Sequence, residues 1–186
     1  MNETLKVINS RRSIRAYKPE QISDEDLQAI LTSAIHAPSA MNQQKWHFAV
    51  VQNKELLAEM VEIAKECIMN SDNEFLKQRA SAPNYHTFHQ APTVIMISGA
   101  ENAPWIDIDC GMAAQNIALA AESLGLGSCI IGTTVSVFNS AKGTRLKKEI
   151  NMPAGYKHMC SVALGFKACE NPAAPARNKE VVSYIE

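Results

Sequence analysis

The chain has 186 residues, of which 46% are apolar and 20% are charged, with a formal net charge of −1. This composition indicates one folded domain spanning residues 1–186, excludes a mostly disordered chain, and argues against a nucleic-acid binder that depends on bulk charge. No window approaches 18 consecutive apolar residues and no signal peptide is recognisable, so we expect a cytoplasmic protein without a membrane span. Five scattered cysteines without a C-x-x-C pair favour free thiols over disulfides or a structural zinc site.

The N-terminal half predicts three helices and one strand. A short helix over 3–12 places the arginines of "RRSIRAY" (residues 11–17) at or just past its C-terminal end. Residues 23–37 open with Ser23 and Asp26 as a capping box and carry apolar residues at helical spacing. A small, polar loop over 37–44 leads to a strand over 46–52, and Asn53 caps a further amphipathic helix.

The second half predicts a sheet around a long helix. Residues 70–90 are polar and irregular, with room for a short helix, and could form a lid. The run over 92–98 is typical of a central strand, 105–124 of a buried helix, and 128–131 of a short strand. A weaker helix over 136–150 is interrupted by Gly143, and a strand over 157–165 precedes a proline-containing tail. These elements predict a layered α+β or mixed α/β fold.

Several motifs fail on inspection. The stretch "GLGSCIIGTT" has Ile130 where a dinucleotide fingerprint needs its third glycine, and Thr133 where a P-loop needs its lysine. His86 and His89 form a close pair without a convincing carboxylate partner, so we expect no metal site. No pair of residues in the sequence suggests a general acid and base, which fits a protein whose reaction is carried out by a cofactor.

The arginine cluster and the loop "APSAMNQQKW" together resemble the FMN-dependent nitroreductase family. Three further stretches follow in the family's order: "QAPTVIMI", "DIDCGMAAQNIALAAESLGLGSC", and "SVALGF" with the later "PARNKEVV". The resemblance spans nearly the whole chain. It implies a three-layer fold with a central, mostly antiparallel sheet flanked by helices, and a homodimer of intertwined subunits with FMN at the interface.

The resemblance also implies a set of cofactor residues. Arg11 and Ser13, helped by Arg177 in the tail, would hold the FMN phosphate, and guanidinium groups and hydroxyls suit such a dianion. Arg15 would lie beside the pyrimidine edge of the flavin. The remaining matches are Pro38, Ser39 and Asn42 from the other subunit, Ile130, Ile131 and Gly132 on one flavin face with the Ile131 N–H donating to N5, Asn84 at the pyrimidine edge, and Arg12, which could equally be a solvated or interface charge.

The implied activity is an FMN-dependent NAD(P)H oxidoreductase that passes hydride through flavin N5 in a ping-pong sequence, with NADH or NADPH as co-substrate. Nitroaromatics, quinones and similar electron-poor molecules would be its acceptors. Reduction of another substrate class, such as dehalogenation or an activated alkene, remains an alternative, as do a flavin-binding module without turnover and a binder of anionic surfaces through "RRSIR". The resemblance assigns no partner beyond a second copy of the chain and a small-molecule acceptor.

Overall fold

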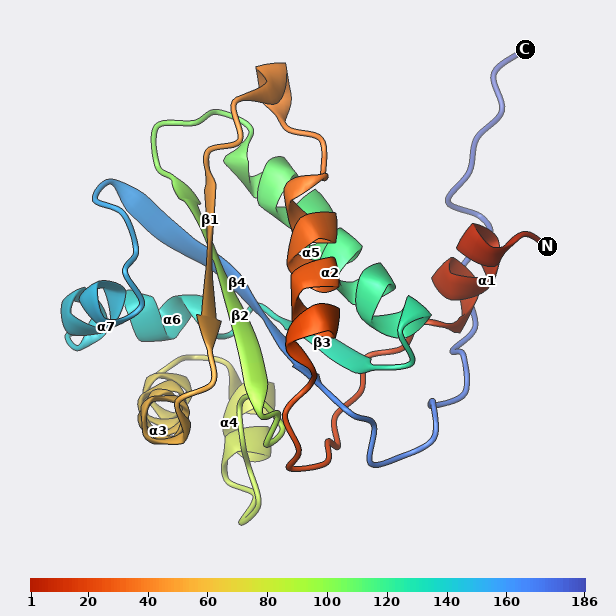
Figure 1. Ribbon diagram of the computed structural model, residues 1–186. Helices are drawn as coiled ribbons and strands as arrows, with labels where there is room; N and C mark the ends of the chain where they lie inside the picture. The colour runs from red at the N-terminus through yellow and green to blue at the C-terminus, as the bar shows by residue number, and fades with distance from the viewer.

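The computed structural model describes residues 1–186 and has three layers, with a four-stranded sheet between two layers of helices (Figure 1). The strands are β1 (Trp46–Val51), β2 (Thr93–Ala100), β3 (Gly127–Ile131) and β4 (Tyr156–Gly165). Their order across the sheet is β1-β2-β4-β3, and each neighbouring pair is antiparallel. The predicted α+β class with an antiparallel central sheet is confirmed.

Helices cover the two faces of the sheet unequally. Helices α2 (Asp24–Ile35) and α5 (Ile106–Ser123) pack on one face, while α3 (Lys54–Met69), α6 (Val135–Phe138) and α7 (Gly143–Glu149) cover the other. Every residue of β2 is buried. Ile95 and Ile97 pack in the core beneath α2 and α5, and Val94 and Met96 pack in the core on the opposite face. The uninterrupted apolar run thus belongs to a strand covered on both sides, as predicted.

Side-chain caps begin the predicted helices. The Ser23 hydroxyl accepts the Asp26 backbone N–H at 3.1 Å and donates to its carboxylate, and Asn53 accepts the Leu56 N–H at 2.8 Å. Helix α1 (Glu3–Ser10) ends immediately before Arg11. The arginine cluster therefore belongs to the connection between α1 and α2, as its sequence context indicates.

Residues 70–90 include the short helix for which the sequence left room, while two other segments differ from their predictions. Residues 70–90 contain α4 (Glu74–Ala80), capped by Asn73, and the loop over 37–44 contains a single 3₁₀ turn, η1 (Ala40–Asn42). The helix expected over 136–150 is two helices, α6 and α7. Helix α7 begins at Gly143. A glycine is needed at this position because a Cβ there would lie 2.1 Å from the Phe138 carbonyl oxygen. This glycine permits a close approach between two turns rather than breaking one helix.

The connection after α1 extends the sheet at its β3 edge. The Ile14 N–H donates to the Ser128 carbonyl at 2.9 Å, within an isolated parallel bridge between Ser13 and Ser128. Gly127 makes this contact possible, since a Cβ there would lie 2.9 Å from the Ile14 side chain. The arginine-rich segment is thereby fixed alongside β3. None of the helices is long and apolar enough to cross a membrane.

Candidate active site

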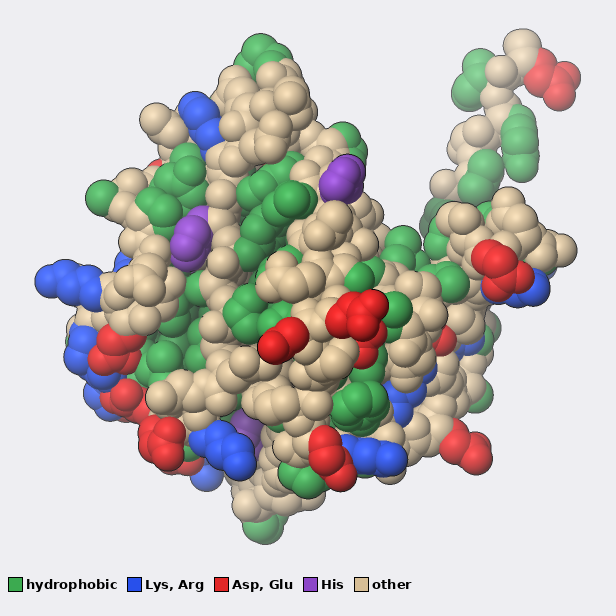
Figure 2. Space-filling view, viewed as in Figure 1, with side chains coloured by type: hydrophobic (Ala, Val, Ile, Leu, Met, Phe, Trp, Pro, Cys, Tyr) green, Lys and Arg blue, Asp and Glu red, His purple; other side chains and the backbone are tan.

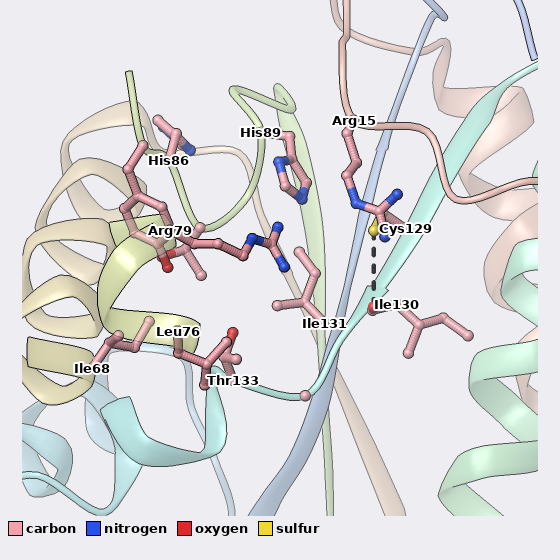
Figure 3. A pocket seen from close by; sticks show the side chains of 13 residues that line it. Arg15, Ile68, Leu76, Arg79, His86, His89, Cys129, Ile130, Ile131 and Thr133 are labelled. Carbon is pink, nitrogen blue, oxygen red and sulfur yellow. Dashed lines mark hydrogen bonds between the residues drawn. The ribbon is translucent and has the colours of Figure 1, made fainter. Parts of the chain in front are cut away.

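A cavity of about 150 Å³ opens where β3 ends. Four parts of the chain meet there: the segment after α1, the C-terminal end of β3, α4 with the end of α3, and the turns over 85–89 (Figure 3). Its lining is formed by Arg15, Ile68, Leu76, Arg79, Tyr85, His86, Thr87, His89, Cys129, Ile130, Ile131, Gly132 and Thr133. The structure thus brings together residues from the cluster "RRSIR" and from "CIIG", which are more than a hundred positions apart in the chain.

Gly132 leaves the backbone bare at this cavity. A Cβ built on it would meet no atom within 4 Å, and its backbone has no positive φ. Neither packing nor conformation therefore requires a glycine. A flat ligand lying against the chain supplies a reason, because only glycine lets the backbone and a ring approach so closely. The exposed Ile130 side chain and the end of the strand at Ile131 adjoin this surface.

Arg15 supplies a positive charge beside this bare backbone. Its side chain is exposed, extends toward Cys129 in Figure 3, and has no carboxylate partner. Its one hydrogen bond, to the Ser13 carbonyl, is long at 3.4 Å. Burial raises the pKa of the Cys129 thiol, so this neighbour is neutral at pH 7. Arg15 is consequently free to bind an anionic group in the cavity.

The opposite side of the cavity contains cationic and neutral nitrogen groups that the sequence interpretation did not assign. Arg79, in the last turn of α4, extends its guanidinium into the cavity, toward His89 and Ile131 (Figure 3). Its sequence context gives no signal, because a basic residue near a helix C-terminus is expected from the helix dipole alone. Asn84, in contrast, is exposed and outside the lining, while its neighbours at 85–87 line the cavity.

A buried polar network lies below the end of β3. The Thr134 hydroxyl donates to the Ile131 carbonyl at 3.1 Å and lies 2.9 Å from His158 Nε2 and 3.0 Å from the Ser161 hydroxyl. Burial lowers the pKa of His158 to about 3, so its ring is neutral. The network fixes the backbone turn that presents residues 131–133 to the cavity. It escaped prediction because its members are distant in sequence.

The loop with Pro38, Ser39 and Asn42 lies elsewhere in the chain. Figure 1 shows η1 at the tip beyond α2 and β1, and none of these residues lines the cavity. The buried Asp109 carboxylate of α5 accepts the Ala40 N–H at 3.1 Å. Three non-glycine residues of the loop have positive φ, namely Met41, Asn42 and Gln44. Such strain persists only where the surroundings impose it, and it is concentrated at functional sites.

The remaining predicted residues lie beside the cavity or outside it. Arg11 and Ser13 are half-buried on the segment beside β3. Arg12 donates to the carbonyls of Asn9, Arg11 and Pro172, which ties the C-terminal tail to the end of α1. Arg177 is exposed farther along that tail. The roles of these residues toward a cofactor stay predictions.

Comparison with known proteins defines the class to which this fold and cavity belong. The family model described as "Nitroreductase family" matches residues 8–166, and the chain belongs to this family. A nitroreductase with bound FMN from Desulfitobacterium hafniense is 38% identical and superposes with a TM-score of 0.92 over 100% of both chains. Another with bound FMN, from Bacteroides fragilis, is 33% identical with a TM-score of 0.91, also over 100% of both chains. An NADPH-flavin oxidoreductase from Vibrio harveyi is 33% identical over 182 residues, covering 95% of this chain and 70% of that protein.

Proposed function

We propose that this protein is an FMN-dependent NAD(P)H oxidoreductase that reduces nitroaromatics, quinones or similar electron-poor acceptors. The bare backbone at Gly132, with an unpaired Arg15 in the same cavity, is the observation that carries this proposal. When bound, FMN supplies ping-pong redox chemistry, accepting hydride at N5 from NADH or NADPH and passing the electrons to the acceptor. The protein contributes position and electrostatics.

The residues of this chain suit each part of FMN. Arg11 and Ser13 offer a guanidinium and a hydroxyl for the phosphate, with Arg177 of the tail as a further cation. The backbone over 130–132 offers a bare surface for the ring, with the Ile131 N–H as the proposed donor to N5. Arg15 would stabilise the negative charge that reduction builds at the pyrimidine edge. Asn84 would have to turn toward the cavity to contribute.

The histidines and the cysteine of the cavity are uncharged at pH 7. Burial lowers the pKa of His86, and it lowers the pKa of His89 to about 4, with Arg15 and Arg79 adding to the shift. Both imidazoles are therefore neutral, and the Cys129 thiol is protonated. This chemistry fits a reaction in which the cofactor carries the hydride and the protein holds no proton relay.

A homodimer with intertwined subunits is part of the proposal. Gly111 lies inside α5, where glycine costs about 1 kcal/mol relative to alanine, yet apart from the backbone of its own helix and its chain neighbours no atom lies within 4 Å of its Cβ position. On the same helix Ile108 is 56% exposed, and Figure 2 shows exposed apolar side chains at the tip of the η1 loop and along the C-terminal tail. A second copy packed on these surfaces would bury them and bring Pro38, Ser39 and Asn42 to its cofactor.

Flavin absorbance during turnover tests the proposal. The purified protein should be yellow, should bleach anaerobically with NADH or NADPH, and should regain its absorbance on addition of menadione or a nitroaromatic. A yellow protein that neither nucleotide bleaches would instead be a flavin-binding module. A colourless protein that does not take up added FMN would reject the assignment altogether.

A further inference from the structure

The charge of the cavity exceeds what the proposed cofactor edge requires. Two guanidinium groups, of Arg15 and Arg79, are among the 13 lining residues, and no aspartate or glutamate is. Neither guanidinium forms an ion pair within the chain. Reduction of the flavin would place a single negative charge at its pyrimidine edge, which one arginine balances. One cation is left without a counterpart.

Arg79 is the cation left over. It belongs to α4, on the opposite side of the cavity from Arg15, and its guanidinium points inward in Figure 3. Lys77, two residues earlier on the same helix, pairs with Glu74 at 2.9 Å. Arg79 has instead only the Phe75 ring, whose centroid is 5.8 Å from its Cζ. The helix therefore neutralises one of its two cations and directs the other at the cavity.

The adjoining histidines add neutral hydrogen-bond donors. His86 Nδ1 accepts the backbone N–H groups of Phe88 and Gln90 at 3.2 and 3.1 Å, so its proton resides on Nε2. These bonds close the turn in which His89 and Gln90 both have positive φ. The turn is thus held in a strained form that keeps both rings at the cavity, as is common at binding sites.

We propose that this cavity selects electron-poor acceptors that carry an anionic group, such as a carboxylate or sulfonate on an aromatic ring, and that Arg79 binds that group. The inference rests on the proposed function. A guanidinium can hold a carboxylate through two parallel hydrogen bonds.

A matched pair of acceptors tests this assignment on the FMN-loaded protein. We expect 4-nitrobenzoate to be reduced with a kcat/KM about tenfold or more above that of the neutral 4-nitrobenzamide, because one charge-assisted contact distinguishes them. Arg79→Gln should abolish the preference, Arg79→Lys should keep part of it, and Lys77→Gln should leave it unchanged. The preference should also decrease as salt is added.

Binding without turnover gives an independent readout. The dissociation constants of benzoate and benzamide, measured by calorimetry or by perturbation of the flavin spectrum, should show the same preference and the same dependence on Arg79. Equal affinity and equal kcat/KM for the two members of each pair would overturn the inference, as would an Arg79→Gln variant that loses FMN or slows reduction by NAD(P)H instead. Failure to reduce both neutral menadione and the neutral 4-nitrobenzamide would reject the proposed function itself.

Discussion

The cavity at the end of β3 and the η1 loop were both implicated by the same resemblance, yet the structure places them very differently. Arg15 and Gly132 meet in one cavity within the chain, and β3 fixes both. The η1 loop is strained, tied to α5 by Asp109, and remote from that cavity. One half of the proposed site is complete in a single chain, and the other half has meaning only if a second copy uses it.

The largest expected effect comes from the half that the chain completes alone. Arg11→Ala/Ser13→Ala should raise the Kd for FMN about 100-fold or more, since each hydrogen bond to a charged group contributes about 1.5–3 kcal/mol. Fluorescence titration of FMN measures this directly. Lys18→Ala removes an exposed cation from the same segment and serves as the control. Unchanged affinity in the double variant would place the phosphate elsewhere.

The second prediction concerns the half that needs a partner. Asn42→Gly should weaken FMN binding about tenfold, because one polar contact from the second subunit is lost while glycine tolerates the φ of 53°. Asn151→Gly, at an exposed asparagine outside the loop with the same φ of 53°, controls for backbone effects and should change little. The FMN titration used for the phosphate variant measures both changes.

Mixed dimers decide whether Asn42 acts within its own chain or across the interface. A dimer that pairs an Arg11→Ala/Ser13→Ala chain with an Asn42→Gly chain has one intact site if the loop acts across the interface, and none if it acts within its own chain. Tagged heterodimers purified at an FMN concentration too low for either homodimer should therefore hold one flavin each. Absence of flavin from the heterodimer would contradict the exchanged loop.

The parts of the fold predicted from sequence are those specified by local patterns. Ser23 and Asn53 cap helices through contacts three residues away, and the buried run of β2 is continuous in sequence. The polar segment over 70–90 was harder to interpret, because α4 has one isolated buried residue, Ala80, and so no apolar stripe. The helix split at Gly143 depends on a contact with Phe138 that no pattern encodes.

The same contrast between local sequence patterns and distant contacts applies to the candidate site. The order of several motifs was enough to predict that Arg15 and Gly132 share one site, because the family resemblance implies that they lie close together, and both line the cavity. Arg79 and Asp109 were missed, since each is locally an ordinary helix residue and acquires its role from a distant segment. The same is true of the network around Thr134.

A third, intermediate effect should come from the buried network around Thr134, which fixes the turn at the end of β3. Thr134→Val removes the hydroxyl that the Ile131 carbonyl, His158 Nε2 and the Ser161 hydroxyl share, which should cost about 1–3 kcal/mol of unfolding free energy. For a chain of this size that lowers Tm by about 2–4 °C per kcal/mol. Thr134→Ser keeps the hydroxyl and should retain most of the stability. Equal losses in both variants would show that the methyl group, rather than the network, matters.

The smallest effect is a change in how steeply the free energy of unfolding varies with pH. Because burial lowers the pKa of His158 to about 3, the folded chain leaves this ring neutral while the unfolded chain protonates it below about pH 6.5. The unfolded state therefore binds more protons between these values, and the stabilisation present above pH 6.5 is lost as the pH falls, by up to about 1.4 kcal/mol per unit. His158→Gln should flatten this dependence in urea unfolding from pH 7 to 5 under excess FMN, whatever its effect on absolute stability. The exposed His36→Gln is the matched control, and a slope in His158→Gln as steep as in the unsubstituted protein would mean that the ring is already accessible to protons in the folded state.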